Sequence, residues 1–235
     1  MTMKTVDVCL SPDLIHLYDV SDKVVVVVDI LRATSCMTAG LANGVKSITP
    51  FENLERCELM KRKGYLIAGE RNGQKVEGFD LGNSPFDYMQ DHVKGEKIAV
   101  TTTNGTVAIE RSRKANEVII GSFLNITAVA NYIKKQSRGV LIVCAGWKGR
   151  INLEDSLFAG ALVDKLMSDF DLDSDAPLLA RASYLHMEKD LLKRIQNSSH
   201  AKRLSKLDIV TDITFCLKHD EYDVVPRLVG NKIID

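Results

Sequence analysis

The chain has 235 residues, of which 45% are hydrophobic and 26% are charged, and its 31 basic side chains balance 31 acidic ones. This composition is typical of a soluble globular protein, and no run approaches the roughly 18 apolar residues of a membrane span. A balanced charge does not support a nucleic-acid-binding protein, which normally shows a basic excess. The five cysteines form no C-x-x-C pair, which is typical of reduced thiols in the cytoplasm. We therefore expect a cytoplasmic protein with no membrane or nucleic-acid partner, and a homo-oligomer is compatible with the same composition.

Strand and helix patterns alternate over the first two-thirds of the chain. Short apolar runs, several of them β-branched, predict buried strands at residues 6–10, 24–28, 45–49, 65–68, 98–101, 118–120 and 139–144. Helical spacing of apolar residues, or a charged surface composition, predicts helices at 33–42, 52–63, 105–113, 126–133 and 154–166. Asn43-Gly44 is expected to end the first of these helices, and Asn125 to cap the fourth. This alternation predicts a three-layer α/β/α fold with a mostly parallel sheet.

Two stretches depart from that alternation. Residues 69–87 contain four glycines and no clear period, and a structureless segment of this length in a compact domain is often functional. After about residue 170 the strand patterns stop, and helices are predicted at 177–196, 199–206 and 211–218. Residues 224–225 and Val229 predict a late edge strand. We expect a single domain over 1–235, in which 170–235 is a mostly helical C-terminal extension packed on the sheet.

Three of the predicted strands end abruptly in polar residues. These are Asp29 and Arg32 after the strand at 24–28, Glu70 and Arg71 after the strand at 65–68, and the turn TTTNGT at 101–106. The carboxyl ends of parallel strands share one edge of a sheet, and ligands bind in the crevice there. We therefore expect two carboxylates, two guanidiniums and a hydroxyl-rich turn to meet in one place, which favours an enzyme.

The residue types at these strand ends suit phosphate chemistry. A carboxylate such as Asp29 or Glu70 can hold a hard cation through oxygen, or act as a base or nucleophile. A guanidinium binds phosphate through two N–H groups, and backbone N–H groups at a helix start attract anions. Each position also has a plain structural explanation, as a helix cap, a solvated charge or an ordinary turn.

Other polar positions carry weaker hypotheses. Asp80, Asn83 and Ser84 in the glycine-rich segment can bind a cation or a polar substrate, or simply form turns. Glu154 and Asp155 open a predicted helix, where the helix dipole alone accounts for acidic residues. The five histidines show no paired metal-binding spacing and are expected to be structural or surface groups. The chain has no Walker A loop and no G-x-G-x-x-G fingerprint, and the absence of a G-x-S-x-G elbow argues against a serine hydrolase.

Seven stretches, taken in order, resemble one known family. They are VVVVVDILRATS (24–35), LANGV (41–45), AGERNG (68–73), GFDLGNSP (78–85), TTTNGT (101–106), CAG (144–146) and LEDSLFAGALV (153–163). Together they are similar to the 2-phosphosulfolactate phosphatases, a family associated with coenzyme M biosynthesis. The resemblance covers about residues 5–230 and is strongest between 24 and 165. The tail at 177–235 matches more loosely, and contacts that discriminate between substrates can differ there.

The resemblance implies a Mg²⁺-dependent phosphatase that converts 2-phospho-3-sulfolactate to 3-sulfolactate and phosphate. Related enzymes accept other phosphorylated 2-hydroxy acids, so the partner is expected to be a small anionic phosphorylated substrate. We expect Mg²⁺ on Asp29 and Glu70, with Asp80 and Asp155 as weaker candidate ligands. Catalysis is assigned to Asp29, Glu70 and Arg32. The expected substrate-binding residues are Arg71, Asn83, Ser84, Thr102, Thr103, Asn104, Gly105 and Thr106.

The mechanism and two other function classes stay open at this point. Attack by water and formation of a phosphoaspartate at Asp29 are both compatible with the residues, but Leu31 replaces the second acid of a D-x-D nucleophile pattern, which favours water. A non-catalytic protein that binds an anionic metabolite would need no metal-binding carboxylates, and its binding would be insensitive to EDTA. A phosphoryl or sugar-phosphate transferase would need a donor site, and no nucleotide fingerprint is present.

Overall fold

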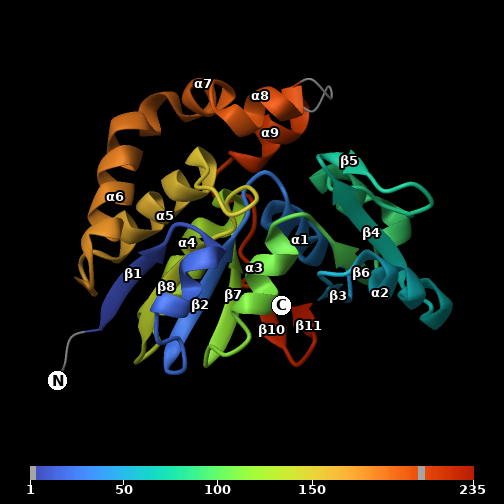
Figure 1. Cartoon of the computed structure of the whole chain (residues 1–235), viewed down its shortest axis with the longest axis horizontal. Coiled ribbons are helices and arrows are strands. Elements are labelled where there is room, and N and C mark those ends of the chain that lie inside the picture. The colour runs from blue at the N-terminus through green and yellow to red at the C-terminus, as the bar shows by residue number, and fades with distance from the viewer. Residues whose placement is uncertain (1–3, 206–209) are drawn as a thin grey trace.

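The computed structural model describes residues 4–205 and 210–235, and its helices and strands form three layers (Figure 1). The strands are β1 (Thr5–Cys9), β2 (Lys23–Val28), β3 (Ser47–Pro50), β4 (Leu66–Arg71), β5 (Gln74–Lys75), β6 (Lys97–Thr101), β7 (Glu117–Gly121), β8 (Gly139–Cys144), β9 (Asp171–Leu172), β10 (Arg227–Val229) and β11 (Lys232–Ile234). The α-helices are α1 (Ala33–Ala42), α2 (Leu54–Glu58), α3 (Gly105–Arg111), α4 (Ile126–Lys134), α5 (Leu153–Leu166), α6 (Asp175–Met187), α7 (Leu191–Gln196), α8 (Ser199–Ser205) and α9 (Val210–Cys216). The predicted α/β/α fold is confirmed.

The sheet consists of two parallel halves joined by a hairpin. Its strand order is β5-β4-β6-β3-β11-β10-β7-β2-β8-β1-β9. Strands β4, β6 and β3 pair in parallel in one half, and β7, β2, β8, β1 and β9 do so in the other. The antiparallel hairpin β10–β11 (red in Figure 1) lies between them. It meets each half at one residue pair, Arg227 with Ile119 and Ile233 with Ile48.

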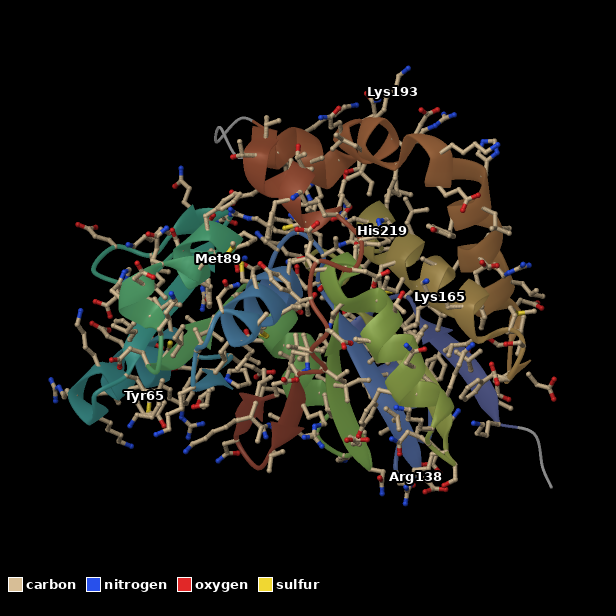
Figure 2. The ribbon with its side chains drawn as sticks, turned by 180° about the vertical axis from the view of Figure 1, so that it is seen from behind. Tyr65, Met89, Arg138, Lys165, Lys193 and His219 are labelled. Atoms are coloured by element: carbon tan, nitrogen blue, oxygen red, sulfur yellow. The ribbon has the colours of Figure 1, made fainter. Side chains whose placement is uncertain are left out.

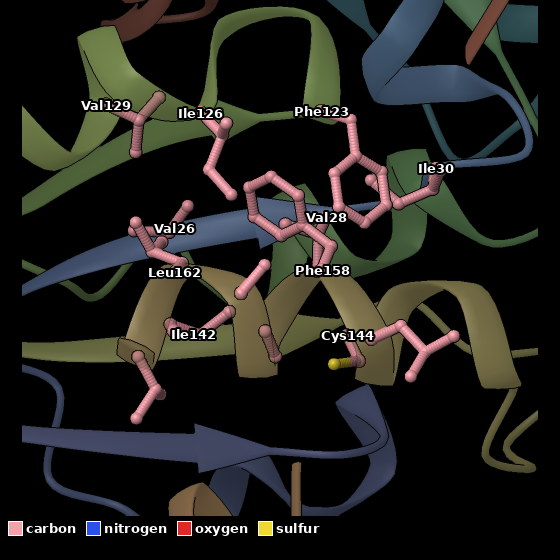
Figure 3. Close-up of a cluster of buried hydrophobic side chains, with 14 of the residues drawn as sticks. Val26, Val28, Ile30, Phe123, Ile126, Val129, Ile142, Cys144, Phe158 and Leu162 are labelled. Carbon is pink, nitrogen blue, oxygen red and sulfur yellow. The ribbon is translucent and has the colours of Figure 1, made fainter. Parts of the chain in front are cut away.

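Strand β2 is buried on both faces of the sheet. Its valines alternate between two apolar clusters: Val26 faces α4 and α5, and Val25 faces α1 and α3. On the first face, the rings of Phe123 and Phe158 pack nearly edge to face, with 5.3 Å between their centroids (Figure 3). Five consecutive apolar side chains suit a parallel strand that is covered by helices on both faces of the sheet. The run of valines therefore indicates, from the sequence alone, that this strand lies in the centre of the fold.

The helices α6 to α9 arch over α5 (orange to red in Figure 1). Helix α6 approaches α5 closely because Gly160 lacks a side chain: a Cβ there would lie 2.1 Å from the carbonyl oxygen of Ala180. Apolar side chains from all four helices pack in the same buried cluster as those of α5 and one face of β2. Lys193, in contrast, points outward from α7 (Figure 2). None of the helices in residues 4–205 and 210–235 is long and apolar enough to cross a membrane.

Three expectations about local structure are wrong. Strand β4 continues to Arg71, because Glu70 and Arg71 pair with the two residues of β5, so this acid–base pair lies within a strand. The glycine-rich segment also contains a 3₁₀ helix, Pro85–Met89. Strand β10 lies inside the sheet order and not at its edge, because β11 and β7 flank it. Strands of two or three residues are too short for a periodic pattern to reveal them.

The predicted helices are found, but two of them are not continuous α-helices. The helix predicted at 52–63 consists of α2 and a following 3₁₀ helix, Leu59–Lys63. A 3₁₀ turn at Glu188–Asp190 interrupts the helix predicted at 177–196 and separates α6 from α7. Residue 206, at the end of the predicted helix 199–206, lies outside the described residues. Asn125 precedes α4 as predicted, but its side-chain oxygen accepts the N–H of Ser122 at 2.9 Å and caps no N–H group of α4. The N–H of Thr127 in the first turn is accepted instead by Oδ1 of Asp220 at 2.7 Å. All five cysteines are buried and free of disulfides.

Candidate active site

A cavity of about 150 Å³ opens where residues that follow strands of both sheet halves meet. Its lining residues are Asp29, Leu31, Arg32, Glu70, Asn72, Gly73, Asn83, Asn104, Trp147, His200 and Arg203. Asp29 follows β2 in one half, whereas Asn104 follows β6 in the other. The two halves therefore bring together residues that are far apart in the sequence.

Asp29 sits at the end of β2 in a tightly bonded loop. Its backbone N–H and carbonyl both lie 3.0 Å from the Thr34 hydroxyl, and its side chain accepts the N–H of Ala33 at 3.4 Å. The side chain is nearly inaccessible, at 6% exposure. Burial first, and then the neighbouring carboxylates of Asp155 and Glu70, raise the pKa of Asp29. Such a carboxylate is poised to take a proton near neutral pH.

Gly105 allows the turn after β6 to pack directly against Asp29. A Cβ at position 105 would lie 2.6 Å from the Cβ of Ala33 and 2.8 Å from Oδ2 of Asp29. Both distances are shorter than a van der Waals contact, so a larger residue would push the turn and the Asp29 loop apart. The glycine of the TTTNGT stretch is therefore needed for the close approach of the two sheet halves.

Asp155, at the start of α5, fastens the loop that carries Asp29. Its Oδ1 accepts the N–H of Ile30 at 2.8 Å, and its Oδ2 accepts the N–H of Gly146 at 3.0 Å and the side chain of Asn152 at 2.9 Å. Burial and the neighbouring Glu154 raise the pKa of Asp155, and the three N–H donors partly offset this rise. Because its oxygens are committed to backbone and amide donors, Asp155 holds loops together and does not line the cavity.

Glu70 joins the turn after β6 to the β4–β5 turn. Its Oε1 accepts the N–H of Thr103 at 2.7 Å, and its Oε2 accepts the N–H of Gly73 at 2.7 Å. The side chain is 5% exposed and lines the cavity. Each oxygen of a carboxylate can accept more than one bond, so Glu70 keeps acceptor capacity toward a ligand.

Arg32 is held by the C-terminal helices. Its guanidinium forms a buried ion pair with Asp212 of α9 through Nη1, and its Nη2 donates to the carbonyl of Gly73 at 3.3 Å. The second oxygen of Asp212 accepts the hydroxyl of Ser84 at 3.0 Å. Nε of Arg32 is buried and has no partner among the described residues. The predicted phosphate-binding group thus reaches the cavity with its charge already paired.

Several predicted site residues are directed elsewhere. Arg71 donates to the hydroxyl of Thr101 at 2.9 Å and to a backbone carbonyl, and it does not line the cavity. Asp80 forms an ion pair with Lys61 at 2.9 Å and accepts the N–H of Ile67 at the same distance. The structure therefore places neither side chain beside Asp29.

The hydroxyls of the TTTNGT turn serve mainly to shape it. The backbone N–H of Thr106 donates to the Thr102 hydroxyl at 3.1 Å, and the N–H of Thr102 donates to the Thr106 hydroxyl at 3.2 Å. Asn104 lines the cavity, and its side-chain oxygen accepts the N–H of Lys148 at 3.0 Å. The Thr103 hydroxyl is buried and has no partner in the described part of the chain.

Six lining residues are absent from the predicted site, and three of them, Leu31, Asn72 and Gly73, lie within three residues of predicted ones. The other three come from segments in which no site residue was predicted. They are Trp147, from the loop after β8, and His200 and Arg203 from α8. The ring of Trp147 lies 5.3 Å from that of His200, and the Arg203 guanidinium lies 4.5 Å above the indole. His200 was expected to be a structural or surface group, but it pairs through Nδ1 with the fully buried Glu154 beside the cavity. The one signal in the sequence is the Glu154-Asp155 pair at the start of a helix that is apolar from Leu157 to Val163.

The donors available to a cation in this cavity are oxygens. Within residues 4–205 and 210–235, no three His, Cys, Asp or Glu side chains are grouped as a metal site. Two carboxylates, Asp29 and Glu70, line the cavity together with the side chain of Asn83. Oδ1 of Asn83 is buried and has no hydrogen-bond partner among the described residues, which makes it an available acceptor.

Known proteins are similar to this chain over most of its length. A family described as 2-phosphosulpholactate phosphatase matches residues 9–231. The chain belongs to this family. Relatives named probable 2-phosphosulfolactate phosphatase include one from Caldanaerobacter subterraneus subsp. tengcongensis, 46% identical over 217 residues that cover 89% of either chain. Others are from Thermotoga petrophila, 42% identical over 97% of both chains, and Clostridium acetobutylicum, 36% identical over 97% of this chain and 99% of that protein.

Membership of the 2-phosphosulpholactate phosphatase family identifies the chain as a phosphoric monoester hydrolase that acts on a small phosphorylated substrate. A cavity of about 150 Å³ suits a compact ligand. Its lining combines carboxylates from the sheet with basic groups held by the C-terminal helices. In this phosphatase, the sheet halves supply Asp29, Glu70 and Arg32, and the helical part supplies His200 and Arg203 together with Asp212, which holds Arg32 in place.

Proposed function

We propose that this protein hydrolyses 2-phospho-3-sulfolactate, or a closely related phosphorylated 2-hydroxy acid, to the hydroxy acid and phosphate, and that it requires Mg²⁺. The observation that carries the proposal is that Asp29 and Glu70, from different sheet halves, line one cavity with basic side chains. The substrate named for the relatives is a compact, multiply charged anion. Both the cavity size and the mixture of charges suit such a ligand.

The donors in the cavity fit Mg²⁺. This ion prefers oxygen ligands, uses one or two carboxylates and keeps several waters. Asp29 and Glu70, with the unpartnered Oδ1 of Asn83, would hold it. A cation there would offset the burial of negative charge that raises the pKa of Asp29. When bound, Mg²⁺ supplies a Lewis acid for the phosphoryl oxygens.

The side chains of the protein then divide the reaction between them. Asp29 accepts the proton of an attacking water, which forms the new P–O bond while the ester P–O bond breaks. Arg32 binds phosphoryl oxygens, and Asp212 keeps its guanidinium in place. Glu154 occupies Nδ1 of His200, which leaves Nε2 to give a proton to the departing hydroxy-acid oxygen. Leu31, two residues after Asp29, supplies no second acid for a phosphoaspartate scheme.

Phosphate release tests the proposal directly. We expect release from 2-phospho-3-sulfolactate in Mg²⁺ and its loss in EDTA, with Asp29→Asn about 100- to 10,000-fold slower, as for loss of a general base. Asp164→Asn is the matched control, because Asp164 is a 36% exposed carboxylate paired with Arg181 on the surface. Equal rates with Mg²⁺ and EDTA would refute the metal requirement. Ligand binding without any phosphate release would instead show a non-catalytic binding protein.

A further inference from the structure

Arg203 is the basic group of the cavity that has no acidic partner in the described part of the chain. The other two basic lining residues of the described chain are paired, Arg32 with Asp212 and His200 with Glu154. The Arg203 guanidinium instead lies 4.5 Å above the centroid of the Trp147 ring. Its Nε is buried and has no hydrogen-bond partner among residues 4–205 and 210–235.

This arrangement leaves a positive charge that a ligand can neutralise. A cation over an indole face gains some electrostatic attraction, but the ring accepts no directed hydrogen bond from Nε. Nζ of Lys148 lies 5.3 Å from the same ring, and the ring of His200 packs against it. Several basic groups thus surround one indole, and Glu154 is the acid that pairs with one of them. The buried Nε–H therefore lacks an acceptor, and an oxyanion bound beside it would supply one.

We propose that Arg203, supported by Trp147, forms the subsite for the sulfonate group of the substrate. This inference rests on the proposed function. The reacting phosphoryl group belongs with Asp29 and Arg32, so the unpaired guanidinium is left for an anionic group that does not react. A sulfonate is a tetrahedral, fully ionised oxyanion. Arg is weakly hydrated and presents two N–H groups in a fork, which suits such an anion better than the compact, strongly hydrated ammonium of Lys does.

A pair of substrates separates this role from a general effect on catalysis. The substrate 2-phospholactate keeps the phosphate and the carboxylate but has a methyl group in place of the sulfonate-bearing carbon. We expect Arg203→Ala to raise KM for 2-phospho-3-sulfolactate by about 10- to 100-fold, the effect of one lost charge-assisted hydrogen bond. KM for 2-phospholactate and kcat for both substrates should change by less than about 3-fold, because neither depends on that bond. Arg203→Lys should lie between Arg203→Ala and the wild type.

Arg194→Ala is the matched control, because Arg194 is an exposed arginine of α7 outside the cavity and its loss changes the net charge equally. We expect it to leave both KM values unchanged. An equal rise in KM for the two substrates in Arg203→Ala would assign Arg203 to the phosphate or the carboxylate and overturn the sulfonate subsite. No change for either substrate would overturn it as well. If Arg203→Ala does not fold, Arg203→Lys gives the same comparison with the charge retained.

Trp147 provides a readout that does not depend on turnover. It is the one tryptophan of the chain, so intrinsic fluorescence reports on this subsite alone. Titration with 3-sulfolactate should change the emission of the wild type, whereas lactate, which lacks the sulfonate, should not. The change should be absent in Arg203→Ala and retained in Arg194→Ala. A response to 3-sulfolactate without phosphate release would refute the proposed function and keep the subsite, whereas equal responses to 3-sulfolactate and lactate would refute the subsite.

Discussion

Replacing Asp155 with Asn should loosen the loops after β2 and β8 while leaving the shape of the side chain unchanged. The carboxylate bonds the N–H of Ile30 through Oδ1 and two further donors, Gly146 and Asn152, through Oδ2. An amide keeps one oxygen, which can replace Oδ2. Its NH₂ group then faces the N–H of Ile30, and because both groups are hydrogen-bond donors, no bond forms between them.

The expected loss follows from these contacts. Removing one charge-assisted hydrogen bond costs about 1.5–3 kcal/mol, and leaving the Ile30 N–H without an acceptor adds about 1–3 kcal/mol. Burial and Glu154 raise the pKa of Asp155, so the amide also removes an unfavourable buried charge, which offsets part of this cost, and we expect the free energy of unfolding to fall by about 2–4 kcal/mol. For a chain of this size, each kcal/mol lowers Tm by about 2–4 °C, which gives a fall of about 4–16 °C. Because Ile30 follows Asp29 directly, the displaced loop should also lower kcat by about 100-fold.

Thermal unfolding followed by circular dichroism at mildly alkaline pH, where Asp155 is ionised, measures this effect. Asp164→Asn makes the same chemical change later in α5, at an exposed ion pair worth less than about 1 kcal/mol. A Tm for Asp155→Asn within about 2 °C of that control would refute the reasoning. It would show that the three hydrogen bonds do not hold the loops together.

Three further results are expected. Burial and neighbouring carboxylates raise the pKa of Asp29, so in EDTA, where no cation offsets this effect, the wild type should lose stability as pH rises through that pKa. Thermal unfolding of Asp29→Asn, which carries no such charge, should therefore give the higher Tm at alkaline pH, and a lower one would contradict the burial effect. Gly105→Ala should lower the free energy of unfolding by about 1–3 kcal/mol, because the added Cβ would crowd Ala33. Urea unfolding measures this loss, and an unchanged urea midpoint would refute the clash. Asp212→Asn should lower the free energy of unfolding by about 3–5 kcal/mol, because it leaves Arg32 buried and unpaired. A urea midpoint equal to that of the wild type would contradict this expectation.

The sequence predicts the parallel strands because the apolar composition of each segment by itself indicates that the segment is buried. Strands β2 and β8 are apolar at consecutive positions, and such runs suit a sheet covered on both faces whichever strands lie beside them. Strands β5, β9, β10 and β11 have two or three residues each and exist because longer neighbours pair with them. Their hydrogen bonds are long-range, so no pattern within the segment specifies them.

The same distinction explains which cavity residues could be found. Asp29 and Asn104 follow predicted strands, so the expected edge of the sheet already places them near a ligand. Trp147 and Arg203 meet only because α8 folds back over the loop after β8. The ion pair of Arg32 was equally hidden, since its partner Asp212 is 180 positions away in the chain.

The hairpin β10–β11, which joins the two halves of the sheet, affects the order in which the protein can fold during translation. Each half of the sheet can form as a nascent chain leaves the ribosome, because its long strands pair among themselves. The halves are joined edge to edge only when residues 227–234 have been made, and the helix that carries Asp212 precedes them by only ten positions. Until residues 227–234 have been made, the two halves share no strand pairing, so Asp29 and Asn104, which follow strands of different halves, are held together by loops and helices alone.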